Sequence, residues 1–157
     1  MSEPVLIWVE VSHHEAFRCG GWAFVRRADG ALEGVAGGDR ATSAERTALN
    51  GVVQALTGLP AGVAARVMSA SPLVLGLPRR IAGFEGGDGP PAEALELWAQ
   101  LAAALKARSV SFAASKAEAR TPTAFAAAWA ELARDKAKAT GPFRAPIPKP
   151  NLAKAGA

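Results

Sequence analysis

Nearly continuous apolar runs and segments with helical spacing of apolar residues follow one another along this chain. Residues 5–11 form such a run, which is typical of a central strand buried on both faces. Residues 21–27 and 31–36 flank Ala28-Asp29-Gly30, a turn signal, and together predict a β-hairpin. Two further strands are predicted over residues 63–69 and 110–112. The pattern therefore predicts five strands.

A helix is predicted over residues 43–57. Thr42 or Ser43 can cap its first turn, and Gly58 and Pro60 end it. Its apolar residues recur at the spacing of one helix face. That face predicts a buried stripe made of Ala48, Leu49, Val52, Val53 and Leu56.

Three more helices are predicted, over residues 71–77, 92–107 and 122–139. The last of them opens at Thr121-Pro122, with proline in the first turn. We expect the apolar positions of the second and third of these helices to be buried, namely Ala94, Trp98, Leu101 and Leu105, then Phe125, Trp129 and Leu132. These elements predict an α/β fold with a mixed five-stranded sheet flanked by helices.

Two segments differ from the rest in composition. Residues 83–91 (GFEGGDGPP) are rich in glycine and proline, contain two acids, and predict an exposed acidic loop. Residues 140–157 contain four prolines and several cations, which predicts an extended or disordered basic tail. The chain is thus expected to consist of a domain over residues 1–139 and a tail over residues 140–157, which could also be inert.

Composition narrows the class of protein. A chain of 157 residues with 50% hydrophobic and 20% charged residues fits one folded domain and not a disordered chain. The single Cys19 cannot form an internal disulfide, which fits a reducing compartment. Neither a signal-peptide pattern nor an apolar run of about 20 residues is present. We therefore expect a cytoplasmic protein without a membrane partner.

Five motifs occur in order over roughly residues 5–139. Two lie in the first predicted strands: VLIWVEVS (residues 5–12) and CGGWAFVR (residues 19–26). The other three are ATSAERTAL (residues 41–49), VMSAS (residues 67–71) and WAELA (residues 129–133), and the last of these lies within the final predicted helix. In this order and spacing, the motifs resemble those of the ribonuclease H type 1 family.

The resemblance implies an RNase H-like fold and a degenerate active site. The family gathers four acids around divalent metal, whereas Glu10 alone stands at an acid position here. Alanine stands at the other three, Ala48, Ala70 and Ala130, and Glu118 replaces the family's mobile histidine. Two-metal cleavage needs several oxygen ligands, and alanine offers none. The resemblance thus implies a pseudoenzyme without catalytic residues, metal or small-molecule cofactor.

The charge favours a polyanionic partner. The net charge is +4 and the isoelectric point is near 9.7. Nucleic acid, either RNA, hybrid or duplex, is expected to contact Arg40, Arg46, Arg79, Arg80, Lys116, Arg120, Arg144, Lys149 and Lys154. A second hypothesis is a protein-interaction scaffold that uses the sheet edge, the acidic loop or the tail. A third is residual ribonuclease H activity.

Other candidate chemistry near Glu10 is weaker. His13-His14-Glu15 offers metal-ligand types, but a third convergent ligand from elsewhere is lacking. We expect Ser12 or the backbone to satisfy the Glu10 carboxylate. Arg40 and Arg46 are expected to be solvated at the rim of the site, and the alternative is anion binding at the start of the first helix.

Overall fold

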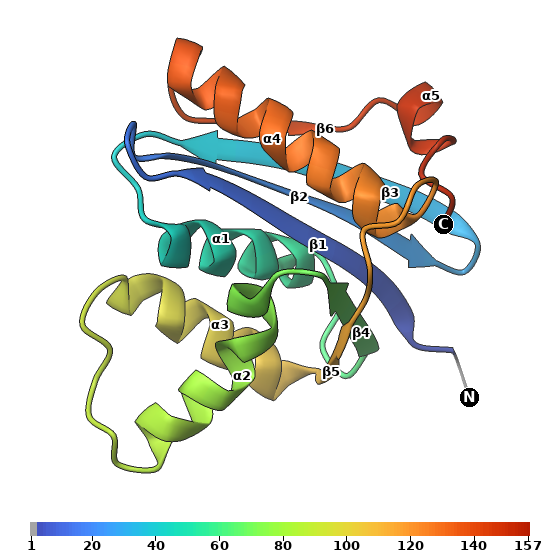
Figure 1. Ribbon diagram of the computed structural model, residues 1–157. Helices are drawn as coiled ribbons and strands as arrows, with labels where there is room; N and C mark the ends of the chain where they lie inside the picture. Colours follow the sequence, from blue (N-terminus) through green and yellow to red (C-terminus); the bar gives the residue numbers. More distant parts are fainter. Residues whose placement is uncertain (1–2) are drawn as a thin grey trace.

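The centre of the protein is a mixed sheet, seen edge-on in the computed structural model, which describes residues 3–157 (Figure 1). Its strands are β1 (Val5–His14), β2 (Cys19–Ala28), β3 (Ala31–Asp39), β4 (Ala64–Ser69), β5 (Ser109–Ala114) and β6 (Phe143–Pro146). Their order is β5-β4-β1-β2-β3-β6. β4 runs parallel to β1 and β5, whereas the β1–β2, β2–β3 and β3–β6 pairs are antiparallel. The predicted central place of the first strand is confirmed, and the sheet has six strands where five were predicted.

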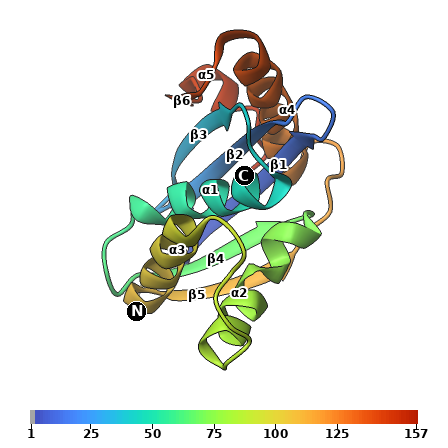
Figure 2. The ribbon, with the colours of Figure 1, turned by 90° about the vertical axis from the view of Figure 1, so that its left-hand side faces the viewer.

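Helices cover both faces of the sheet. They are α1 (Ala44–Thr57), α2 (Pro72–Glu85), α3 (Leu95–Ala107), α4 (Pro122–Thr140) and the short α5 (Lys149–Leu152). α1, α2 and α3 lie on one face and α4 on the other (Figures 1 and 2). The alternation of β1 separates the two cores, because Ile7 and Val9 belong to the α1 side and Trp8 to the α4 side. None of the described helices is long and apolar enough to cross a membrane.

α1 follows its sequence pattern. The Ser43 hydroxyl accepts a hydrogen bond from the Arg46 amide at 3.0 Å and caps the helix. All five predicted stripe residues are buried. α2 is longer than predicted and takes up residues 83–85 of the predicted acidic loop. The reason is that Phe84 packs edge-on against Trp98, with ring centroids 5.0 Å apart, which extends the contact between α2 and α3.

The buried face of α4 differs from the prediction. Leu132 is 59% exposed, and Phe125 and Trp129 are only half-buried. The buried face consists of small residues, namely Thr123, Ala126, Ala130, Ala133 and Ala137. A methyl group on Gly21 of β2 would lie 2.2 Å from the Arg134 amide nitrogen and 2.3 Å from the Ala130 carbonyl oxygen. The backbone of α4 therefore approaches the sheet too closely for large side chains to fit between them.

The predicted tail is part of the fold, which corrects the expectation of an extended or disordered segment and of a boundary at residue 140. β6 pairs with β3, and Ile147, Leu152 and Ala155 are buried in the core on the α4 side. The Ile147 amide donates to the Gly34 carbonyl at 2.9 Å. In an antiparallel pair the amide direction alternates, so residues 142, 146 and 148 point their nitrogens away from β3. All three are prolines, and they therefore remove no hydrogen bond from the sheet.

Candidate functional site

The Glu10 carboxylate is held at the junction of β1 and β4. Glu10 is 5% exposed. Its Oε2 accepts hydrogen bonds from the Ser69 hydroxyl at 3.0 Å and from the Ala70 amide at 2.7 Å. The Ser69 oxygen in turn accepts from the Ser71 amide at 3.0 Å. The backbone partner was predicted, but the hydroxyl comes from Ser69 and not from Ser12, because the parallel pairing of β4 with β1 brings the end of β4 to Glu10.

Burial raises the pKa of the Glu10 carboxyl above its ordinary value. The hydrogen bonds from Ala70 and Ser69 favour the charged form and oppose this shift without cancelling it. Glu10 is thus an acid whose protonated form is favoured by its surroundings, and one of its oxygens is already engaged inside the protein.

The three alanines occupy different parts of this region. Ala70 contacts Glu10 through its amide. Ala130 is fully buried on the α4 side, and its carbonyl lies over Gly21, two residues from the Glu10 partner Ala23 in β2. Ala48 is fully buried in the core on the α1 side. Small apolar side chains therefore fill the positions at which the family resemblance expects carboxylates.

The residues of this region do not fit a two-metal centre. Within residues 3–157, no three His, Cys, Asp or Glu side chains gather closely enough to hold a metal ion. Such a centre needs several carboxylate oxygens shared between two ions. Glu10 is a single carboxylate, and its Oε2 already accepts two hydrogen bonds. No catalytic step through a metal can be derived from these residues.

A cation, Arg134, lies one helical turn beyond Ala130. Its Nη1 donates to the Ser12 hydroxyl at 2.8 Å, and its Nε donates to the Asp135 carboxylate at 3.0 Å. The side chain is 19% exposed. Arg134 was missed by the sequence analysis, although its spacing of four residues from Ala130 puts both on one helix face. The α4 side of β1 therefore carries a guanidinium that is held by the Ser12 hydroxyl and by the Asp135 carboxylate.

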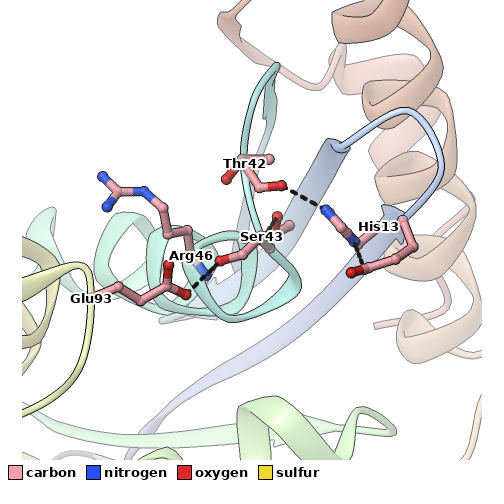
Figure 3. A network of polar contacts seen from close by, with 7 residues as sticks. His13, Thr42, Ser43, Arg46 and Glu93 are labelled. Atoms are coloured by element: carbon pink, nitrogen blue, oxygen red, sulfur yellow. Dashed lines mark hydrogen bonds and ion pairs between the residues drawn. The ribbon is translucent and has the colours of Figure 1, made fainter.

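The start of α1 holds a second polar network (Figure 3). His13 Nε2 lies 2.8 Å from the Thr42 carbonyl oxygen, and His13 Nδ1 lies 3.2 Å from a Glu15 carboxylate oxygen. The Ser43 hydroxyl donates to Glu93 at 3.0 Å. Both ring nitrogens of His13 thus face oxygens of the protein. His14 packs instead against Phe17, with ring centroids 5.4 Å apart and the rings tilted by 31°.

Arg40 and Arg46 line one polar cavity of about 540 Å³ beside this network. Both guanidinium groups are engaged. Arg40 donates to the Ala137 and Lys138 carbonyls at 3.0 and 2.9 Å, where it caps the end of α4. Arg46 pairs with Glu96, whose pKa is lowered by its own backbone amide and by this arginine. The two arginines are therefore brought together at one cavity, and each is also bonded to other groups of the protein.

The other predicted cations divide into two groups. Arg80 pairs with Glu45 and lies over the Trp98 ring, 4.7 Å from its centroid, and Arg144 Nε donates to Gln54 at 2.6 Å. Five side chains are exposed and form no hydrogen bond or ion pair with residues 3–157, namely Arg79, Lys116, Arg120, Lys149 and Lys154.

Two of these exposed cations lie in the loop between β5 and α4. The Ser115 amide donates to the Ser69 carbonyl at 2.9 Å, so the loop carrying Lys116 and Arg120 begins beside the Glu10 site. The exposed Glu118 lies in the same loop. A methyl group on Gly156 would lie 2.3 Å from the Arg120 carbonyl oxygen, so the segment with Lys154 packs against this loop.

Comparison with solved structures shows the fold, whereas no protein-family model and no curated protein matches the chain. The chain is similar to LC9-RNase H1, described as a type 1 RNase H with the type 2 active-site motif, with 16% identity and a TM-score of 0.67 over 99% of this chain and 86% of that one. It is similar to the N-terminal RNase H domain of Rv2228c from Mycobacterium tuberculosis, with 20% identity and a TM-score of 0.61; the match covers 88% of this chain and 97% of that domain. It is also similar to LC11-RNase H1, solved in complex with an RNA/DNA hybrid, with 16% identity and a TM-score of 0.60; the match covers 85% of this chain and 98% of that one. The chain has an RNase H-like fold.

Proposed function

We propose that this RNase H-like chain is a non-catalytic nucleic-acid-binding protein, a pseudonuclease. The observation that carries the proposal is the state of Glu10. It is the only carboxylate left at the four expected positions, and it is buried and hydrogen-bonded to Ser69 and Ala70. Alanine at the other three positions supplies no oxygen for a divalent ion.

The same replacements suit the binding of a phosphate backbone. A cluster of carboxylates without metal repels phosphate, whereas alanine and serine do not. Arg134, which is paired with Asp135, presents a guanidinium on the α4 side, and Lys116 and Arg120 are exposed in the loop that begins beside Ser69. The hybrid complex of LC11-RNase H1 supports nucleic acid as the class of ligand, by analogy of fold.

Salt-dependent binding tests the proposal. Anisotropy of a labelled RNA–DNA hybrid, duplex RNA and duplex DNA would be measured from low to high salt. Each phosphate contact contributes about one to the log–log slope, so a Lys116→Ala/Arg120→Ala variant should lower the slope by about two. Lys106→Ala is a control, because Lys106 is exposed near the end of α3, on the other face of the sheet. Absence of salt-dependent binding, or an equal effect of the control, would refute the proposal.

The proposed lack of nuclease activity is tested separately. With Mg²⁺ or Mn²⁺, the protein should not cleave an RNA–DNA hybrid above background, because one engaged carboxylate cannot hold two ions. Cleavage that disappears in a Glu10→Ala variant would show that the residual acid still supports metal chemistry, and the pseudonuclease assignment would then be wrong.

A further inference from the structure

α4 is apolar on two sides, and only one of them is covered by the sheet. The alanine side is buried, whereas Phe125, Trp129 and Leu132 form a second stripe at the spacing of one helix face. Leu132 is 59% exposed and lies one helical turn from the half-buried Trp129. Phe125 and Trp129 pack in part against the core on the α4 side, whereas most of Leu132 stays exposed among the described residues.

Trp129 and Leu132 of this stripe form one wall of a groove of about 250 Å³. The opposite wall is formed by Phe143, Pro146 and Pro148, in and after β6. The groove is open to solvent, and its lining is mainly apolar. A single bulky aliphatic or aromatic side chain is of a size to fill it, as in helix-in-groove recognition.

One charged side chain is among the residues that line the groove, and it is a cation. Lys136 lines it, with Nζ 4.5 Å from the centroid of the Phe143 ring, and is exposed. Lys149 follows Pro148 and is also exposed. None of the side chains that line the groove is acidic. The complementary ligand therefore combines an apolar group with negative charge.

Addition of a partner strand to β6 is blocked. Residues 142, 144, 146 and 148 point their nitrogens away from β3. Three of these residues are prolines, which have no N–H, so Arg144 alone offers a backbone donor there. An extended peptide would therefore find one backbone donor along this edge, whereas strand addition depends on a row of them. Recognition at the groove must depend on side chains, which a helix presents without using its backbone.

We propose that this groove docks an acidic amphipathic helix of a partner protein. A bulky apolar residue of that helix enters between α4 and β6, and flanking carboxylates face Lys136 and Lys149. Lys149 belongs to both proposals, but Leu132 and Lys136 are not among the residues expected to contact nucleic acid, and only these two are changed in the test. The two proposals can therefore fail independently.

The proposal can be tested with a random 12-residue peptide library displayed on phage and selected against the full chain. Enriched peptides should combine a bulky apolar residue with Asp or Glu. Their synthetic, fluorescein-labelled forms should bind at least tenfold more weakly to Leu132→Asp and to Lys136→Glu. A peptide with lysines in place of its acids should bind Lys136→Glu better than it binds the unaltered protein.

Leu95→Asp is the matched control, because Leu95 is also 59% exposed but lies at the start of α3, on the other face of the sheet. Thermal melts would verify that all variants fold. The proposal is overturned if no peptide is enriched, if Leu132→Asp leaves binding unchanged, or if Leu95→Asp weakens it equally. It is also overturned if sedimentation shows a dimer that Leu132→Asp disperses, or if that variant loses binding to the RNA–DNA hybrid, since a second copy or nucleic acid would then occupy the groove.

Discussion

Gly21 controls how closely α4 can lie on the sheet, and its replacement by alanine has a predictable cost. The added methyl group would lie 2.2 Å from the Arg134 nitrogen and 2.3 Å from the Ala130 oxygen. Both are backbone atoms of a helix, so no side-chain rotation relieves the overlap, and α4 must move by about 1 Å. Overpacking of this kind costs about 1–3 kcal/mol. For a domain of this size, that corresponds to a fall in Tm of roughly 2–12 °C.

Thermal and urea unfolding of Gly21→Ala would measure this cost. Gly76→Ala in α2 is the control, because a methyl group there meets no atom within 4 Å. Alanine is the better helix former, so this control should gain about 0.4–1 kcal/mol. If Gly21→Ala is as stable as the unaltered protein, α4 does not lie as close to β2 as described, and the explanation of its alanine face is wrong.

Three further predictions follow from the same structure. Because the pKa of Glu10 is raised, the folded protein tolerates the protonated carboxyl better than the charged one. The stability that protonated Glu10 contributes is fully present below its ordinary pKa of 4.5 and is lost as the pH rises through its raised pKa. Urea unfolding from pH 4 to 8 should therefore show Glu10→Gln gaining stability relative to the unaltered protein as the pH rises, and parallel curves would contradict this. Deletion of residues 143–157 should lower stability by about 3–6 kcal/mol from the loss of Ile147 and Leu152 alone, and an unchanged urea midpoint would count against their burial. Ala130→Asp should lower Tm, because it buries a carboxylate at a fully buried position, and should not create Mg²⁺-dependent cleavage of a hybrid. A stable or active Ala130→Asp variant would show that α4 can move away from β2.

α1 and α4 show what the hydrophobic pattern can predict. In α1, the large apolar residues Leu49, Val52 and Leu56 are the ones that the core accepts, so helical periodicity identified the buried face. In α4, the pattern pointed to Phe125 and Trp129, but the glycines of β2 and β3 leave room only for alanine. That restriction depends on two strands distant in sequence, and a helix pattern taken alone does not contain it.

The candidate site was predictable where it depended on local sequence. Glu10 lies on the central strand, and Ala70 lies beside it at the end of β4, as the motifs implied. The roles of Ser69 and Arg134 were not predicted, because the first depends on the pairing of β4 with β1 and the second on the close approach of α4. The order of residues 143–157 was also missed, because four prolines suggested an unpaired chain. Their spacing places three of them where no hydrogen bond is needed.

The late position of β6 in the chain matters for biosynthesis. β3 ends at Asp39, whereas the strand that covers its edge begins only at Phe143. At about 5–20 residues per second, a ribosome needs on the order of 5–20 s to synthesise the intervening residues. During that time β3 has an open edge, which is a template for pairing with other chains. Incomplete chains that end before Phe143 keep this edge open permanently, so we expect them to aggregate more readily than the chain that includes β6.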